Sequence, residues 1–243
     1  MDMDSNFKPY DHVASASRIR QILNQSDVNY SEVDSLPDRD RLTYSNGFYA
    51  YCSALFVDIR ESSKLPSKYR RPTLARLYRA YVSEVVAIMN SDPYCREVNI
   101  VGDGAWAVYN TPSARDINDV FRIAYTINSM IQVLNYELQR RSINSISVGL
   151  GMSYGRALMI KAGYSGSGLH DVVYMGDVVN HSAKLAAHGN KTHSDEPVMV
   201  SELFYENLTE DNKKLLRWNS QRGCWHGYVV NSSMESWFEQ NCK

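Results

Sequence analysis

Two aspartates, Asp58 and Asp103, stand where apolar, strand-like segments give way to polar residues. Asp58 ends the apolar part of ALFVDIRESS, residues 54–63, and Asp103 precedes Gly104 within VNIVGDGAWAVY, residues 98–109. An Asp-Gly pair between two such runs predicts a β-hairpin. If the two strands are neighbours, the two carboxylates can share hard divalent cations that keep open positions for phosphate oxygens.

A third polar segment lies in VVYMGDVVNHSAKLAA, residues 172–187, which passes from a strand-like run through Gly176 and Asp177 into a helical pattern. In that helix Asn180 and Lys184 are four residues apart and therefore share one face. Taken singly, an Asp in a turn, an Asn near a helix start and a Lys on a helix surface are common without any function. The three segments together, in this order, indicate a site.

These segments resemble the three motifs of the class III nucleotidyl cyclases, the family of adenylate and guanylate cyclase catalytic domains. In that family a strand ending F-x-D-I supplies the first metal aspartate, an I-G-D-G-type hairpin supplies the second, and G-D-x-V-N-x-A-x-R opens a catalytic helix. This chain has FVDI, VGDG and GDVVNHSAK, and the resemblance covers about residues 48–238. Within the family it resembles the pyrimidine cyclases of bacterial Pycsar antiphage systems.

The resemblance implies a reaction in which the 3′-oxygen of a nucleoside triphosphate attacks the α-phosphorus and pyrophosphate leaves. Two divalent cations, Mn²⁺ or Mg²⁺, would be held by Asp58, Asp103 and the backbone carbonyl of Ile59. Asn180 matches the asparagine that orients the ribose. Lys184 stands where the family usually has an arginine that stabilises the transition state, so it would offer a point charge instead of a bidentate fork.

The polar turn after Asp58 is expected to bind the β and γ phosphates through backbone N–H groups, with Arg60 and Ser63 as candidate substrate-binding residues. The family usually has Gly-Phe-Thr where this chain has Glu61-Ser62-Ser63. A capped helix start without a phosphate site is the alternative interpretation of the turn.

Base recognition is expected to involve Asn99, Val173 and Phe56. Adenylate cyclases have lysine at the first of these positions and aspartate or threonine at the second, and guanylate cyclases have glutamate and cysteine. Neither purine pair is present, so the site is expected either to be promiscuous or to fit a smaller base. The resemblance to the Pycsar enzymes, in which uridylate production is the commoner activity, implies a uridylate cyclase that converts UTP to cyclic UMP. By analogy with the resembling group, this product would be a second messenger of antiphage defence, read by a separate effector protein.

Three alternatives stay open: a cytidylate cyclase, an adenylate cyclase with a divergent base pocket, and a non-catalytic nucleotide-binding module. The last is suggested because a C-terminal phosphate-binding lysine of the family has no clear match in RGCWHGYVVNSS. The presence of both Asp58 and Asp103 argues against it, since a binding module has no need for two metal ligands.

The resemblance also implies a head-to-tail homodimer, because the family builds each site from two subunits. Asp58 and Asp103 of one chain would complete a site with Asn180 and Lys184 of the other, giving two equivalent sites.

Bulk properties agree with a nucleotide site in a cytoplasmic protein. The chain has 243 residues and a net charge of −1, so no general basic field favours nucleic acid or a membrane as partner. No apolar run approaches the roughly 18 residues that span a bilayer. The four cysteines form no C-x-x-C pair, which favours a reduced compartment.

The order of elements predicts an α/β (α+β) sandwich with helices on one face of a largely antiparallel, class III cyclase-like sheet. Residues 1–46 are expected to hold an N-terminal helix, within 11–25, and a connecting segment, and residues 47–243 the catalytic domain. The elements expected within that domain are helices at 72–90, 117–141 and 201–208, strands at 145–153, 157–162 and 198–200, a Gly-Ser loop at 163–168, and strand-like runs at 225–230 and 235–238.

Overall fold

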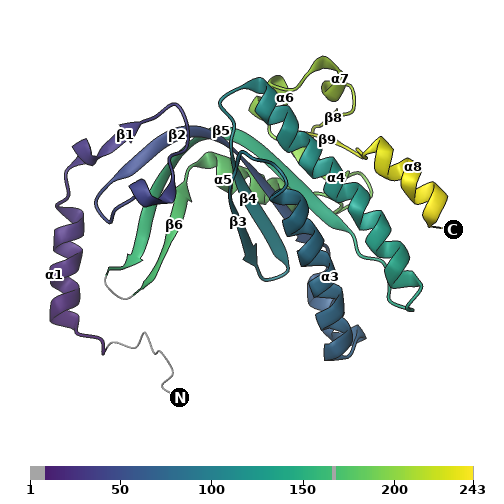
Figure 1. Ribbon diagram of the computed structural model, residues 1–243, viewed down its shortest axis with the longest axis horizontal. Coiled ribbons are helices and arrows are strands. Elements are labelled where there is room, and N and C mark those ends of the chain that lie inside the picture. The colour runs from purple at the N-terminus through teal and green to yellow at the C-terminus, as the bar shows by residue number, and fades with distance from the viewer. Residues whose placement is uncertain (1–8, 166–167, 243) are drawn as a thin grey trace.

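The computed structural model describes residues 9–165 and 168–242. Its centre is a strongly curved sheet in which most neighbouring strands are antiparallel (Figure 1). Among the described pairs, β1–β2 and β5–β7 are parallel. The path of the sheet is β3-β4-β2-β5-β7-β9-β8, with β1 beside β2 and β6 beside β5. The strands are β1 Tyr30–Glu32, β2 Gly47–Ile59, β3 Cys95–Val101, β4 Gly104–Asn110, β5 Val148–Tyr164, β6 Leu169–Met175, β7 Val198–Val200, β8 Arg217–Asn219 and β9 Cys224–Gly227.

Two long helices cover one face of this sheet (Figure 1). In α3, residues Leu77, Tyr81 and Val85 are buried at intervals of four, so a single stripe of the helix faces the strands. These side chains and those of α4 form the larger core against alternate residues of β2, such as Leu55 and Val57. The helices are α1 His12–Leu23, α2 Leu65–Lys68, α3 Arg71–Met89, α4 Ala114–Gln139, α5 Asp177–Ala186, α6 Glu202–Glu206, α7 Glu210–Lys213 and α8 Ser232–Asn241.

Helix α5 lies on the opposite face, which the expectation of helices on one face did not include. Two glycines of β5 allow this close approach. A Cβ on Gly149 would lie 2.1 Å from the carbonyl oxygen of Ala186, and one on Gly151 would lie 2.1 Å from that of Ser182. The predicted α/β fold with a largely antiparallel sheet is confirmed, and α5 adds a partial layer to its second face.

The segment 26–46, expected only to connect, is part of the folded unit. It carries β1, which pairs with the start of β2, and its Leu36 and Leu42 are buried in a second core on the α5 side of the sheet. Two leucines within a polar stretch give no periodic pattern, so the sequence does not reveal their burial.

Two other expectations differ from the structure. The strands predicted at 145–153 and 157–162 are one continuous strand, β5, which extends to Tyr164, and residues 166 and 167 of the predicted loop lie outside the described residues. The strand-like run 235–238 is part of helix α8, capped by Asn231, because its apolar residues follow helical and not alternating spacing.

The predicted N-terminal helix forms α1, at the end of the molecule far from α3 and α4 (Figure 1). None of its residues is buried, and Val13, Ile19, Ile22 and Leu23 are mostly exposed. Among all described residues, no helix combines the length and hydrophobicity needed to cross a bilayer.

Candidate functional site

Asp58 and Asp103 come together at one end of the central strands of the sheet, as the sequence predicts. Asp58 is the second-last residue of β2, and Asp103 lies in the tight turn that joins β3 to β4. That turn closes through Gly102, whose φ of 62° suits glycine. It approaches β2 closely, since a Cβ on Gly104 would lie 3.5 Å from Oδ1 of Asp58.

The electrostatics of this pair fit a cation site. Burial raises the pKa of Asp58, and the neighbouring Asp103 carboxylate raises it further, while Arg60 opposes both effects. Oδ2 of Asp103 is buried without a hydrogen-bond partner in the described part of the chain. Two close carboxylates, one of which has an oxygen without a hydrogen-bond partner, are oxygen ligands of the kind that hard divalent cations bind.

The described residues hold no cluster of three or more His, Cys, Asp or Glu side chains suited to a metal ion. A cation held between Asp58 and Asp103 would therefore need backbone or substrate oxygens to complete its coordination. The carbonyl of Ile59, the last residue of β2, is the sequence-based candidate for such a ligand.

Arg60, a candidate phosphate-binding residue, is bonded to other groups of the chain and does not extend into solvent. Its Nη2 lies 2.5 Å from Oδ2 of Asp58, its Nη1 donates to the carbonyl oxygen of Ala187 at 2.8 Å, and its side chain is 12% exposed. The arginine thus joins the first candidate metal ligand to the C-terminal end of α5.

The turn that follows Arg60 is a short 3₁₀ helix, Ser62–Lys64, in which Ser63 is exposed. Glu61 precedes it with a φ of 54°, in the left-handed region that favours glycine. This is the position where the resembling family usually has glycine. The turn therefore keeps the backbone conformation suited to glycine although the residue type has changed.

A basic hollow adjoins this turn. It has a volume of about 560 Å³, and its lining includes Arg60, Lys64, Lys68 and Lys191. Glu61 also lines the hollow and is paired with Lys64, and Arg60 is paired with Asp58. The lining still has a net positive charge next to the metal-ligand candidates, which suits an anionic group.

The structure brings Asn99 and Phe56 onto one surface through Trp106. Asn99 is in register with Trp106 across β3 and β4, and the Trp106 ring stacks on Phe56 with centroids 5.4 Å apart and planes 6° apart. In β6 the ring that contacts Trp106 is Tyr174, whereas Val173 alternates to the other side and is 39% exposed. Val173 is thus not brought onto this surface within one chain.

The structure adds Glu97, Arg39 and Tyr174 to this surface. Oε1 of Glu97 accepts a hydrogen bond of 3.1 Å from Nδ2 of Asn99 and lies 3.7 Å from Nη1 of Arg39. Burial and the Glu97 carboxylate raise the pKa of Tyr174 well above its ordinary value. The alternation of strand residues could have placed Glu97 beside Asn99, but Arg39 comes from the segment expected only to connect.

Asn180 and Lys184 lie on the exposed side of α5, opposite its buried residues Val178, Ser182 and Leu185. In the described residues, no hydrogen bond or ion pair joins either side chain to Asp58 or Asp103. Both candidate catalytic side chains are therefore presented outward from the chain that carries them.

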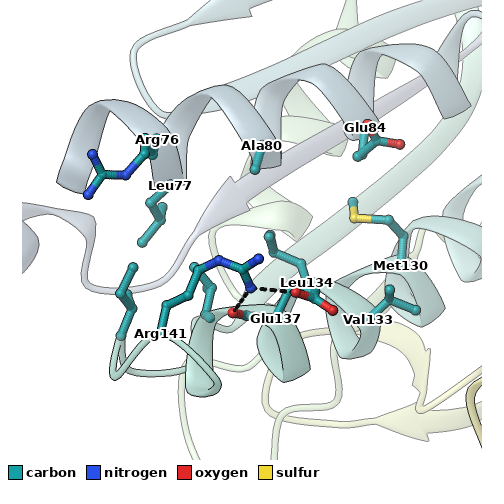
Figure 2. Close-up of a pocket in the computed structure, with 11 residues that line it drawn as sticks. Arg76, Leu77, Ala80, Glu84, Met130, Val133, Leu134, Glu137 and Arg141 are labelled. Carbon is teal, nitrogen blue, oxygen red and sulfur yellow. Dashed lines mark hydrogen bonds and ion pairs between the residues drawn. The ribbon is translucent and has the colours of Figure 1, made fainter. Parts of the chain in front are cut away.

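A more apolar hollow lies between α3 and α4, on the face of the sheet that does not carry Asp58. Its volume is about 470 Å³. Figure 2 shows Leu77 and Ala80 of α3 facing Leu134 of α4, with Arg141 bonded to Glu137 beside them. Neither Asp58 nor Asp103 lines this hollow, and its Glu137 is paired with Arg140 and Arg141, so it is not the candidate site.

Comparison with known proteins gives two relatives that span most of the chain. A uridylate cyclase from Treponema porcinum is 38% identical over 215 residues, 88% of this chain and 74% of the relative. A uridylate cyclase from Gulbenkiania mobilis is 41% identical over 228 residues, 88% of this chain and 86% of the relative. No family model matches the chain.

Solved structures show the same fold at low identity. A class III adenylyl cyclase-like ATP-binding protein from Pseudomonas aeruginosa superposes with a TM-score of 0.70 and 16% identity, over 93% of this chain and 48% of that one. The adenylyl cyclase CyaB from P. aeruginosa gives a TM-score of 0.59 and 17% identity, over 71% of this chain and 85% of its own. The fold expected from the three motifs is thereby confirmed.

Proposed function

The chain belongs to the uridylate cyclase family, and from this premise we propose that it converts UTP to 3′,5′-cyclic UMP and pyrophosphate. The observation that carries the proposal is the close pair Asp58 and Asp103, with its orphaned carboxylate oxygen, on a class III cyclase fold. A purely nucleotide-binding module would gain nothing from placing two repelling carboxylates together.

Asp58 and Asp103, with the carbonyl of Ile59, would hold two divalent cations, Mn²⁺ or Mg²⁺. When bound, such cations favour deprotonation of the 3′-hydroxyl and neutralise the leaving phosphates. The protein contributes the fixed position of both carboxylates, because one ends a central strand and the other is held by a tight hairpin.

Arg60 would exchange partners when substrate binds. Its own-chain contacts neutralise Asp58 and tie it to the end of α5. A cation at Asp58 would remove the need for that pairing, and the guanidinium would then be available to an anion in the basic hollow that Arg60 lines. We assign this region to the β and γ phosphates, which match guanidinium and backbone N–H donors.

Each complete site would be shared by two chains in a head-to-tail homodimer. The exposure of Asn180 and Lys184 on α5 supports this, since both are free of contacts to the metal-ligand candidates of their own chain. From a second copy, Asn180 would orient the ribose and Lys184 would offset the charge that builds up on the α-phosphate. The exposed apolar side of α1 gives a second surface for such an assembly.

Selection of a pyrimidine is supported by the stacked rings of Phe56 and Trp106, which fill the surface beside Asn99. Bulky rings leave less room for a bicyclic base. We further propose that the cyclic UMP is an antiphage second messenger made in the cytoplasm and read by a separate effector protein, as in the Pycsar systems.

The test is product identification. Purified protein is incubated with each of the four ribonucleoside triphosphates and Mn²⁺, and products are separated by chromatography and identified by mass. Cyclic UMP and pyrophosphate in equal amounts are expected, and none should form when EDTA replaces Mn²⁺. Cyclic AMP as the dominant product would instead favour an adenylate cyclase, and no product from any nucleotide would favour a binding module.

A further inference from the structure

Glu97 is a buried acid at the centre of the proposed base-reading surface. Its side chain is 4% exposed, and its Oε2 is buried without a hydrogen-bond partner among the residues that the structure describes. Burying a carboxylate is costly, so a core position of this kind is normally apolar unless the charge is used. The groups around Glu97 are the Asn99 amide, the Arg39 guanidinium and the Tyr174 hydroxyl.

The chemistry of these groups fixes the orientation of the Asn99 amide, that is, which of its two terminal atoms faces Glu97. An ionised carboxylate only accepts hydrogen bonds, so the atom of Asn99 that bonds to Glu97 must be the donor Nδ2. Arg39 stabilises the negative charge of Glu97 from 3.7 Å and is itself held by Asp171, with Nη2 2.5 Å from Oδ1. The carbonyl oxygen Oδ1 of Asn99 is therefore turned away from Glu97 and stays available as an acceptor.

Uracil and cytosine differ at the edge that an amide would read. Uracil has an N3–H donor beside an O4 acceptor, whereas cytosine has an N3 acceptor beside an N4 amine. An asparagine free to rotate can match either base by exchanging its oxygen and nitrogen. An asparagine tied through Nδ2 cannot, because the reversed amide would turn its oxygen toward a carboxylate and leave both acceptors unsatisfied.

We propose that Glu97 is a positioning residue that locks the Asn99 amide in the orientation that accepts from N3–H of uracil, and thereby selects UTP over CTP. This inference rests on the proposed function, because it assigns base selection within the same site. Glu97 acts through Asn99 and touches no substrate.

The test is the ratio of kcat/KM for UTP to kcat/KM for CTP in Glu97→Gln. Glutamine has nearly the same shape but can donate or accept, so the Asn99 amide is free to reverse. We expect the ratio to fall at least tenfold, mainly because CTP improves, with kcat for UTP changed less than about threefold. Glu210→Gln, the same change at an exposed glutamate paired with Lys213, is the matched control and should keep the ratio.

A double-mutant cycle separates positioning from a structural role. In an Asn99→Ala background no amide remains to be oriented, so adding Glu97→Gln should leave the ratio unchanged. A general loosening of the site would instead change the ratio in both backgrounds, which overturns the proposal. If Glu97→Gln does not fold, Arg39→Gln replaces it, and the same fall in the ratio is expected because the charge on Glu97 loses its stabilising partner.

The outcomes distinguish this inference from the proposed function. If a folded Glu97→Gln protein makes cyclic UMP with an unchanged UTP-to-CTP ratio of kcat/KM, the role of Glu97 is overturned and the cyclase function stands. If Glu97→Gln does not fold, the same result in Arg39→Gln has the same meaning. A wild-type protein that makes no cyclic UMP overturns both.

Discussion

Nη2 of Arg60 lies 2.5 Å from Oδ2 of Asp58, so one of the two candidate metal ligands is already paired with a cation of the protein itself. The other, Asp103, keeps a buried oxygen without a partner in the described residues. The chain's own groups therefore balance one carboxylate and leave the second uncompensated. Bound cations would then relieve Asp103 directly and displace Arg60 from Asp58.

Asp103→Asn should therefore separate stability from activity. Removing one of two close like charges should leave the melting temperature of the metal-free protein unchanged or raise it. Cyclase turnover should fall more than about a hundredfold, because a group that stabilises the reacting charges is lost. Differential scanning fluorimetry in EDTA and product assays in Mn²⁺ measure the two effects.

Asp211→Asn, at an exposed carboxylate paired with Lys214, is the control for that experiment and should change neither quantity. A further readout is the rise in melting temperature on adding Mn²⁺, which Asp103→Asn should reduce. Near-normal turnover in Asp103→Asn would remove the assignment of this carboxylate to the metal site.

Subunit complementation addresses whether each site spans two chains. Inactive Asp58→Ala and inactive Asn180→Ala proteins, mixed under conditions of subunit exchange, should regain activity because a mixed dimer has one site with both halves undamaged. With random pairing, about a quarter of wild-type activity is expected. Product formation is measured after the two proteins have been mixed and incubated.

The matched control mixes Asp58→Ala with Asp103→Ala. Both changes damage the same half of the site, so every site of a mixed dimer carries a defect and activity should stay absent. If exchange is demonstrated by labelled subunits and the first mixture also stays inactive, the site does not lie between chains.

Local patterns sufficed to place the two metal-ligand candidates. A carboxylate at the end of an apolar strand and an Asp-Gly turn depend only on neighbouring residues, and the structure places Asp58 and Asp103 together accordingly. The position of α5 on the second face was not predictable in the same way. It depends on Gly149 and Gly151, which look like ordinary strand glycines until a helix backbone is found against them.

The residues around Asn99 show a second limit. Glu97 could have been placed by strand alternation, since it stands two residues before Asn99. Arg39 and Tyr174 reach Glu97 from elements distant in sequence, the first from a 3₁₀ helix before β2 and the second from β6. Contacts of this kind follow from tertiary packing and leave no periodic signal in one sequence.

Variants of Lys184 test what it means that this chain has lysine where the family usually has arginine. Lys184→Ala should lower kcat for UTP by about a hundredfold or more with little change in KM, because the charge acts mainly in the transition state. Lys184→Arg, which restores the usual family residue, should retain or increase kcat, since a guanidinium can bind two phosphate oxygens at once. Steady-state kinetics of both variants at saturating Mn²⁺ measure this. Equal activity in all three proteins would show that position 184 carries no catalytic charge.

Asp195 is hydrogen-bonded to the end of β8 and to the turn that joins β8 to β9, so we expect it to contribute to stability in acid. Its buried carboxylate accepts from Nε and Nη2 of Arg222, at 3.1 and 2.8 Å, and from Thr192 and Asn219. These bonds, those of Arg222 first, hold the pKa of Asp195 well below its usual range. A carboxyl with a lowered folded-state pKa stabilises the fold above its unfolded-state pKa of about 4, and this contribution is lost as pH falls further.

Asp195→Asn should therefore lower the free energy of unfolding by about 2 kcal/mol at pH 7, the scale of hydrogen bonds to a charged group. The difference from wild type should persist at pH 5 and shrink steadily below pH 4, because the Asp195 carboxyl then binds a proton in the unfolded chain before it does so in the folded one. Urea unfolding of both proteins at pH 7, 5 and 3 measures it, with Asp211→Asn as the exposed-carboxylate control. A gap at pH 3 as large as that at pH 7 would show that Asp195 contributes through shape and not through its charge.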